Sequence, residues 1–204
     1  MKTVNSTGPI MPSKPSFTEV YESHYDRIWR FVLHATADVH MAMELTSRVF
    51  YRAVRAWPRY EMSAAPVEVW LLRIAVNEWR RELRRRKLSR LLPLPEPSAT
   101  DWEAEHVDLT EVNAAVAALE KDEAYRSLRR AIAALPEKYE TPLLLHYFES
   151  QTFEEVAAVL GRPVGTVKSL VHRGLARLRQ DQGLRESLGL SFTEARPQPT
   201  KGQV

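Results

Sequence analysis

The chain has 204 residues, 44% of them hydrophobic, and contains no cysteine. This length suits one domain or two small ones, and the lack of cysteine excludes disulfide frameworks, thiolate zinc sites and cysteine nucleophiles. The net charge of +3 says little by itself. The distribution of charge says more, because arginines gather at 73–90 and acidic residues gather at 96–123, which suggests distinct working surfaces.

The N-terminal segment and the hydropathy of the chain bear on location. No run approaches the roughly 20 apolar residues that span a bilayer. Residues 1–16 contain three prolines and lack the apolar core of a secretory signal. We therefore predict a disordered N-terminus at 1–16, no membrane insertion, and a cytoplasmic protein.

Apolar residues recur at helical spacing and strand patterns are almost absent, so the sequence predicts an all-α fold. A first helix is expected at about 17–37 and a second at about 39–57, where Pro58 ends it. After a loop at 59–65, a third helix begins near Pro66 and continues past Arg86. The inward-facing residues predicted for these helices are Phe17, Val20, Tyr21, Tyr25, Ile28, Phe31, Val32, Met41, Leu45, Val49, Phe50, Val54, Val67, Trp70, Leu71, Ile74 and Ala75.

Three prolines, at 93, 95 and 97, interrupt this helical pattern. The chain that follows is acidic, apart from an alanine-rich piece at 113–119 that favours a helix. Proline keeps a chain extended and like charges oppose collapse, so we interpret residues 93–123 as an acidic flexible linker. The predicted organisation is two small helical domains, at 17–92 and 124–182, with a flexible tail at 183–204.

The second domain shows a helix-turn-helix pattern within about 135–179. Short helices are expected at about 124–135 and 137–148. Thr152 precedes Glu155 by three residues, the spacing of a capping box, so a further helix is predicted from Thr152 to Leu160. Gly161 provides the positive φ that a sharp turn needs, and Thr166 is expected to cap a last helix that reaches Gln180.

The last two helices carry apolar stripes that would pack them together, which leaves the polar side of the last helix facing outward. Polar side chains near the start of a recognition helix meet base edges, and later cations suit phosphates. The DNA-reading residues predicted here are Thr166, Lys168, Ser169, His172, Arg173 and Arg177. An ordinary helical hairpin with a solvated charged face is the alternative.

These motifs resemble two regions of bacterial RNA polymerase sigma factors of the extracytoplasmic-function (ECF) type, in the sigma-70 family. Region four is similar to LPEKY at 135–139, YFE at 147–149, TFEEVA at 152–157, GTVKS at 165–169 and HR at 172–173. Region two is similar to residues 17–31, 50–57, WLLRIAVN at 70–77 and LRRR at 83–86. The resemblance covers most of the chain and preserves the order of the two blocks.

The resemblance implies that the chain binds the clamp and flap of the large subunits of core RNA polymerase and directs the enzyme to promoters. Region four would read the minus-thirty-five element as duplex. Region two would read the minus-ten element, help to open it and hold unstacked bases of the non-template strand. The linker would thread through the polymerase. An anti-sigma factor is a usual partner of the family, and the sequence leaves its presence open.

Binding of single-stranded DNA requires aromatic surfaces beside a cationic groove. Two aromatic residues border a loop at 61–65 that matches the family's base-capturing loop, and four polar residues on one face of the third helix follow it. Asparagine suits a base edge and arginine suits phosphates. The residues predicted to contact the single strand are Trp57, Tyr60, Arg73, Asn77, Arg80 and Arg84. Core packing is accepted for Trp70 and stays open for Trp57 and Trp79.

The second helix departs from the family's acidic–Leu–x–Gln–acidic pattern, which helps to dock the polymerase clamp. Ser47 stands where Gln is expected, and Arg48 reverses an expected negative charge. The polymerase-binding residues that the resemblance implies are Glu44, Leu45, Arg48, Phe50 and Arg52.

Two functions follow. One is an ECF sigma factor that directs promoter recognition and DNA opening, as a specificity subunit without catalytic residues of its own. The other is a sigma-like DNA- or polymerase-binding regulator that does not open promoters. An enzyme acting on DNA is disfavoured, because the sequence shows no carboxylate cluster at metal spacing, no Gly-rich phosphate loop and no Ser/His/Asp set. No cofactor is expected.

Overall fold

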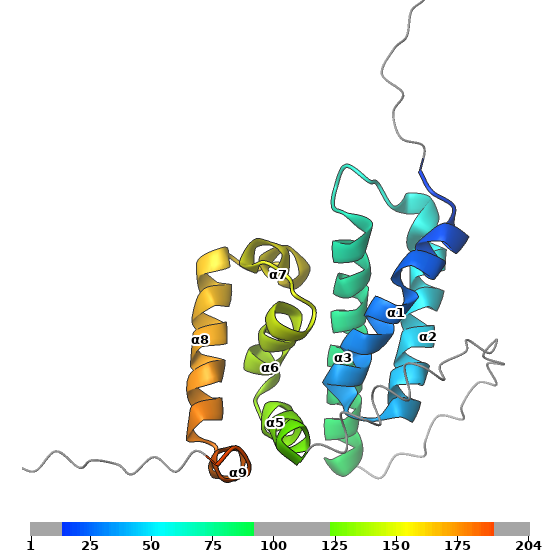
Figure 1. Cartoon of the computed structure of the whole chain (residues 1–204). Coiled ribbons are helices and arrows are strands. Elements are labelled where there is room, and N and C mark those ends of the chain that lie inside the picture. The colour runs from blue at the N-terminus through cyan, green and yellow to red at the C-terminus, as the bar shows by residue number, and fades with distance from the viewer. Residues whose placement is uncertain (1–13, 92–122, 190–204) are drawn as a thin grey trace, which may run out of the picture.

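The computed structural model describes residues 14–91 and 123–189, and these residues form helices and short connections, without a strand among them. The N-terminal unit, residues 14–91, contains α1 (Phe17–Thr36), α2 (Val39–Ala56), the 3-10 turn η1 (Trp57–Arg59) and α3 (Val67–Leu91). The C-terminal unit, residues 123–189, contains α5 (Glu123–Ala133), α6 (Glu137–Leu143), the π-helical turn η2 (Leu144–Phe148), α7 (Phe153–Leu160), α8 (Val164–Gln180) and α9 (Gln182–Ser187). The predicted all-α class is confirmed (Figure 1).

The three long helices of the N-terminal unit form a bundle around one apolar core. Ser16 begins α1 with a capping box to Glu19, which satisfies amide groups at the start of the helix. The predicted inward stripe of α1 is confirmed by Ile28, Phe31 and Val32, and that of α3 by Leu71 and Ala75, as these side chains are all buried. The core holds the three helices in fixed register, which positions their outer faces.

The predicted inward position of Val54 in α2 is wrong. Val54 is 43% exposed, whereas Ala53 is fully buried. Ala53 lies four residues after the buried Val49, so it takes the inward place on the helix and turns Val54 toward solvent.

The helix ends on either side of the turn between α7 and α8 match two of the three local predictions. Thr152 and Glu155 form the predicted capping box, and Gly161 ends α7 with a φ of 62°, so both expectations are confirmed. The expectation that Thr166 caps the last helix is wrong, because α8 begins at Val164. The carbonyl of Pro163 accepts the amide of Thr166 at 3.0 Å, so the fixed φ of proline sets the start of the helix without a side-chain cap.

The single helix expected at 137–148 is divided into α6 and the wider turn η2, with Pro142 inside α6. Next to it, α8 approaches α6 closely at Gly174. A Cβ at Gly174 would lie 2.7 Å from Leu143 Cδ1, so only glycine fits there without movement of the neighbours.

Part of the segment expected to be a flexible tail is the helix α9. Asp181 accepts the amide of Leu184 at 2.8 Å and so begins α9, and Leu184 is buried. Ser127 of α5 also donates a hydrogen bond to the Gly183 carbonyl at 3.3 Å. The predicted linker and its piece at 113–119 lie outside the described residues, apart from Glu123 at the start of α5, and so do residues 1–13 and 190–204.

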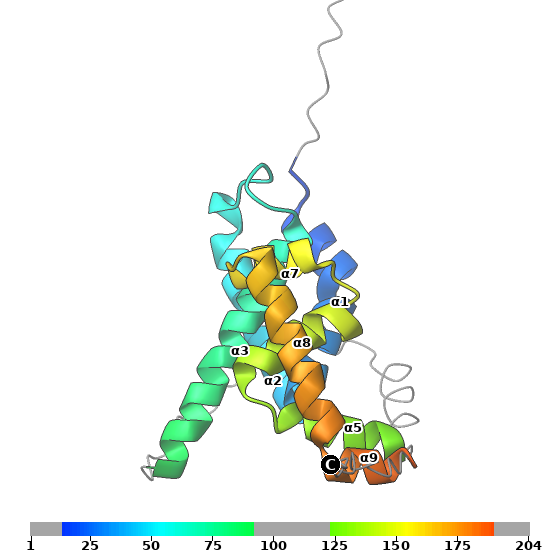
Figure 2. The ribbon, with the colours of Figure 1, turned by 90° about the vertical axis from the view of Figure 1, so that its left-hand side faces the viewer.

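The two units pack against each other. The contacts join α3 to α7 and α1 to both η2 and α5. Figure 2, turned so that α8 faces the viewer, shows α8 in front of α6 and on the far side of the C-terminal unit from the N-terminal bundle. Within the described ranges, no helix is long and apolar enough to cross a membrane.

Candidate nucleic-acid interface

The outer face of α8 gathers the polar side chains that the sequence assigned to duplex DNA. Lys168, Ser169, His172 and Arg173 are exposed, while Val167 and Val171 are buried beneath them. The Oγ of Ser169 donates to the carbonyl of Gly165 at 2.9 Å, and Thr166 is half-buried in the first turn. This face is open to solvent and cationic, which suits a helix that enters a major groove.

Arg177, further along α8, rests on an aromatic ring that the sequence did not single out. Its guanidinium carbon lies 5.0 Å from the centre of the Tyr139 ring in α6. Such a cation–π contact restrains the arginine while its polar edge stays in water. The contact therefore restrains a cation toward the C-terminal end of α8, where the sequence predicts phosphate contacts.

The aromatic residues beside the predicted base-capturing loop form a stack at the end of α2. The rings of Trp57 and Tyr60 lie 5.0 Å apart and nearly parallel, and Trp70 flanks both. Tyr60 is buried and its hydroxyl donates to the Ala65 carbonyl at 2.5 Å, so it restrains the end of the loop at 61–65. Trp57 and Trp70 both keep partial exposure.

Lys14 is a functional candidate that the sequence did not reveal, since it belongs to the segment expected to be disordered. Its Nζ lies 4.6 Å from the centre of the Trp57 ring and donates to the Tyr60 carbonyl at 2.8 Å. It also donates to the carbonyl of Trp57. Lys14 thus closes the η1 turn and adds a positive charge beside the aromatic stack.

The four polar residues predicted on one face of α3 differ in their surroundings. Arg73 Nη2 donates to the Ala158 carbonyl of α7 at 2.6 Å, and Arg80 Nε pairs with Glu137 of α6 at 2.6 Å. Asn77 and Arg84 are exposed. Half of the predicted single-strand face is therefore in contact with the C-terminal unit.

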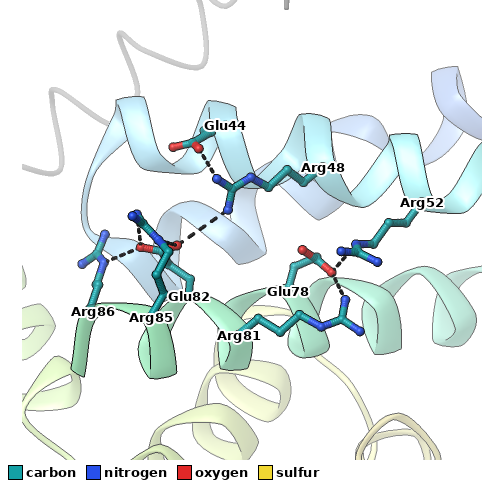
Figure 3. Close-up of polar contacts among 8 residues, drawn as sticks. All are labelled: Glu44, Arg48, Arg52, Glu78, Arg81, Glu82, Arg85 and Arg86. Carbon is teal, nitrogen blue, oxygen red and sulfur yellow. Dashed lines mark hydrogen bonds and ion pairs between the residues drawn. The ribbon is translucent and has the colours of Figure 1, made fainter. Parts of the chain in front are cut away.

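The remaining arginines of α3 do not share that face. Glu78 and Glu82 are buried on the side of α3 that meets α2. Figure 3 shows Arg81 paired with Glu78, and Arg85 and Arg86 paired with Glu82. The run of basic residues that looks continuous in the sequence is thus split, and its second group pairs with carboxylates of α3 itself.

Glu82 has a chemically distinct environment. Burial by itself would raise the pKa of Glu82, but hydrogen bonds from Arg85 at 2.9 Å and Arg86 at 2.9 Å outweigh burial and hold this pKa below its usual value. The Glu–Arg spacings of three and four residues along α3 are the signal in the sequence that predicts such pairs.

The carboxylates of Glu78 and Glu82 also pair with arginines of α2, among them Arg48, whose charge is opposite to the one expected from the family pattern. Arg48 pairs with Glu44 on its own helix and lies 3.6 Å from Glu82 Oε2, and Arg52 pairs with Glu78 at 2.6 Å (Figure 3). The positive charge at position 48 is therefore neutralised within the N-terminal unit.

Two of the residues expected to bind polymerase lie in the core instead. Leu45 is 1% exposed and Phe50 is 5% exposed, because the inward stripe of α2 contains both. Their side chains cannot form an outer docking surface in this fold. The outer face of α2 carries Met43, Tyr51 and Val54 beside the arginines, and all three are exposed.

An open cationic face on α8, together with an aromatic stack next to a cationic helix, is an arrangement typical of a helical nucleic-acid-binding protein with two modules. The sigma-70 region 2 family model matches residues 20–89, and the sigma-70 region 4 model matches residues 125–178. The two matches together span more than half of the chain. The chain belongs to the sigma-70 family.

Curated relatives agree with this assignment, and a solved structure has a similar fold. The ECF RNA polymerase sigma factor SigE of Mycolicibacterium smegmatis is 30% identical over 81% of this chain, which spans 61% of that protein. The ECF sigma factor SigW of Bacillus subtilis is 27% identical, with 81% of this chain and 88% of SigW covered. The fold is similar to that of the sigma factor RpoE from Bartonella quintana, solved with the anti-sigma factor NepR, at a TM-score of 0.58 and 19% identity over 86% of this chain and 98% of RpoE.

Proposed function

We propose that this chain is an ECF-type sigma factor that binds core RNA polymerase and directs promoter recognition and DNA opening. The observation that carries the proposal is the presence in one chain of an open recognition helix, α8, and a stacked aromatic pair beside α3. These are the parts needed to read a duplex element and a single-stranded element separately. In this role the chain confers specificity on the polymerase, which performs the catalysis.

In the duplex-reading module, the first turns of α8 would enter the major groove of the minus-thirty-five element. Lys168 and Arg173 can donate to guanine edges, and His172 lies beside them on the same face. Arg177 is held against Tyr139 at a distance from the helix start that suits a phosphate.

In the single-strand module, Trp57 would stack on an unpaired base of the non-template strand. Base–aromatic stacking contributes about 1–3 kcal/mol per base, enough to offset much of the cost of unstacking. Asn77 offers a donor and an acceptor to a base edge, and Arg84 is exposed for a phosphate.

The polymerase would dock on the outer face of α2. This face combines the exposed Met43, Tyr51 and Val54 with the charged heads of Glu44 and Arg52. Exposed apolar side chains rimmed by charges are typical of protein interfaces. An anti-sigma factor is a further partner that we propose for this chain, since RpoE of Bartonella quintana was solved with one.

Transcription in vitro tests the proposed function. Purified chain and core polymerase, incubated with a pool of genomic promoter fragments, are expected to produce specific transcripts and permanganate-reactive thymines near the start sites. Core polymerase without the chain serves as the control. If promoter duplexes are bound but never become reactive and no transcript forms, the chain is a sigma-like regulator that does not open promoters.

Arg173→Ala is expected to weaken duplex binding by about 10- to 100-fold, because a lost contact to a base edge costs about 1–3 kcal/mol. The measurement is a titration of a selected promoter duplex by gel shift at moderate salt. Arg126→Ala is the matched control, since it removes an equal charge from the exposed surface of α5. Equal affinities for the two variants would contradict the assignment of α8 as the recognition helix.

A further inference from the structure

Two aromatic rings from different elements are stacked on each other close to α8. The His146 ring of η2 lies 4.1 Å from the Phe153 ring of α7, centre to centre, with 21° between the ring planes. Such a close and nearly parallel contact leaves no room for another group between the rings. These two rings, called the aromatic shelf below, join the turn η2 to the first residue of α7.

Hydrogen bonds on both sides fix the orientation of the aromatic shelf. His146 Nδ1 lies 2.7 Å from the Gln151 carbonyl, and because a carbonyl can only accept, Nδ1 carries the proton and the ring cannot turn freely. The capping box of Thr152 and Glu155 begins α7 at Phe153. Both rings are half-buried, so part of each stays at the surface. The shelf is therefore held in place by the protein itself.

A lysine of α8 rests against the aromatic shelf. Lys168 Nζ lies 5.5 Å from the centre of the Phe153 ring, within the range of a cation–π contact. Because His146 covers one face of that ring, the ammonium approaches from the other face or the rim. Lys168 is exposed in the second turn of α8, on the face that carries the predicted DNA-reading residues. The shelf thus restrains a cation at the start of that face.

The kind of partner that Lys168 has leaves its charge available. In the part of the chain that the structure describes, Lys168 pairs with no carboxylate, in contrast to Arg81 and Arg85 of α3. A ring attracts an ammonium group without neutralising it and without accepting all three of its N–H donors. Because a lysine side chain has many rotamers, restraint before binding also reduces the entropy lost on binding.

We propose that Phe153 and His146 are positioning residues for duplex recognition, and that the aromatic shelf holds the Lys168 ammonium in place for one guanine edge in the major groove. The two rings act through Lys168 and need not touch the DNA. Lysine donates to O6 and N7 of guanine, so the shelf sets the preference for guanine at one base pair. This inference deepens the proposed function and rests on it, because it takes duplex DNA to be the ligand of α8.

The test is a double-variant cycle with Phe153→Leu and Lys168→Met, measured on the full chain. A randomised duplex library, enriched by binding to the native chain, supplies a preferred duplex, and single base-pair changes in it give the preference at each position. Lys168→Met is expected to abolish the preference for guanine at one base pair. Phe153→Leu is expected to reduce the preference at that base pair by about two- to fivefold, and to have no further effect in the Lys168→Met background.

Three further variants separate positioning from support of the fold. Phe153→Tyr keeps the ring and is expected to retain the native preference, whereas His146→Ala removes the stacked partner and is expected to reduce the preference at the same base pair. Phe148→Leu is the matched control, since it makes the same change at another half-buried phenylalanine, whose ring contacts His34 of α1. It is expected to leave every preference unchanged. Urea unfolding reports the stability of each variant, because lower stability weakens binding to all duplexes alike.

The inference is overturned if Phe153→Leu weakens binding to all duplexes equally in both lysine backgrounds, since Phe153 then only supports the fold. It is also overturned if Lys168→Met keeps every native preference, or if Phe153→Tyr behaves like Phe153→Leu. An unchanged preference in His146→Ala overturns the role assigned to His146.

The same measurements separate the inference from the function on which it rests. If the chain starts transcription with core polymerase but the cycle shows no coupling between Phe153 and Lys168, the inference fails and the proposed function stands. If the coupling is found at one base pair but the chain never starts transcription, the proposed function fails and the positioning role stands.

Discussion

Gly174→Val is expected to lower the free energy of unfolding by about 2 kcal/mol, because overpacking a tight contact typically costs about 1–3 kcal/mol. A Cβ at this position would lie 2.7 Å from Leu143 Cδ1 and 3.4 Å from Tyr139 Cβ, and valine adds two methyl groups beyond it. α8 would have to move away from α6, so the recognition helix would lose its position. Duplex binding is expected to weaken along with stability.

The same substitution at another place on α8 is the control for that prediction. Gly165 also lies in α8, and a Cβ there would have no atom within 4 Å among those considered. Gly165→Val is expected to leave the urea midpoint close to that of the unchanged chain, because only helix propensity changes. If both variants unfold at the native midpoint, the close approach of α8 to α6 is not a constraint on the fold.

Stability is expected to fall as the pH rises from about 4.5 to about 8, because of Glu140. Burial, together with the nearby charge of Glu137, raises the pKa of Glu140 from 4.5 to about 8, and Trp79 and Arg129 oppose this shift. In this window the folded chain keeps a proton on Glu140 that the unfolded chain releases, so unfolding becomes easier with increasing pH. The stability that protonated Glu140 contributes is complete below pH 4.5 and lost above the folded pKa.

Glu140→Gln is expected to remove most of this pH dependence. An amide keeps the shape of the protonated carboxyl and has no proton to lose, so at pH 7 the variant should be more stable by about 3 kcal/mol. At pH 4 the two proteins should differ little. Urea unfolding at both pH values checks this, with Glu154→Gln on the exposed side of α7 as control. A variant with the same slope against pH as the unchanged chain would contradict it.

The helices and their caps could be predicted because their signals are local. Thr152 and Glu155 stand three residues apart, which is sufficient for a capping box, and Gly161 follows at the end of the same helix. The outer face of α8 was equally predictable, since buried Val167 and Val171 determine which side faces solvent. Such patterns depend on helix geometry alone, so no distant contact has to be known.

Side-chain roles that depend on a second helix could not be predicted in the same way. The sequence shows a run of arginines, but only the burial of Glu78 and Glu82 on the side of α3 that meets α2 separates the arginines that pair with these carboxylates from those on the other face of α3. Leu45 and Phe50 match a family pattern by position, yet the core of the N-terminal unit buries them.

The sequence by itself determined that the protein is all-α, that it carries a helix-turn-helix in its C-terminal part and that it resembles ECF sigma factors. Periodicity, caps and motif order suffice for these conclusions because they involve residues close together in the chain. Only the tertiary structure decided which charges are free, since Arg73 and Arg80 meet partners more than 50 residues away. Their engagement by Ala158 and Glu137 depends on how the two units pack, and the spacing of residues along a helix cannot reveal that packing.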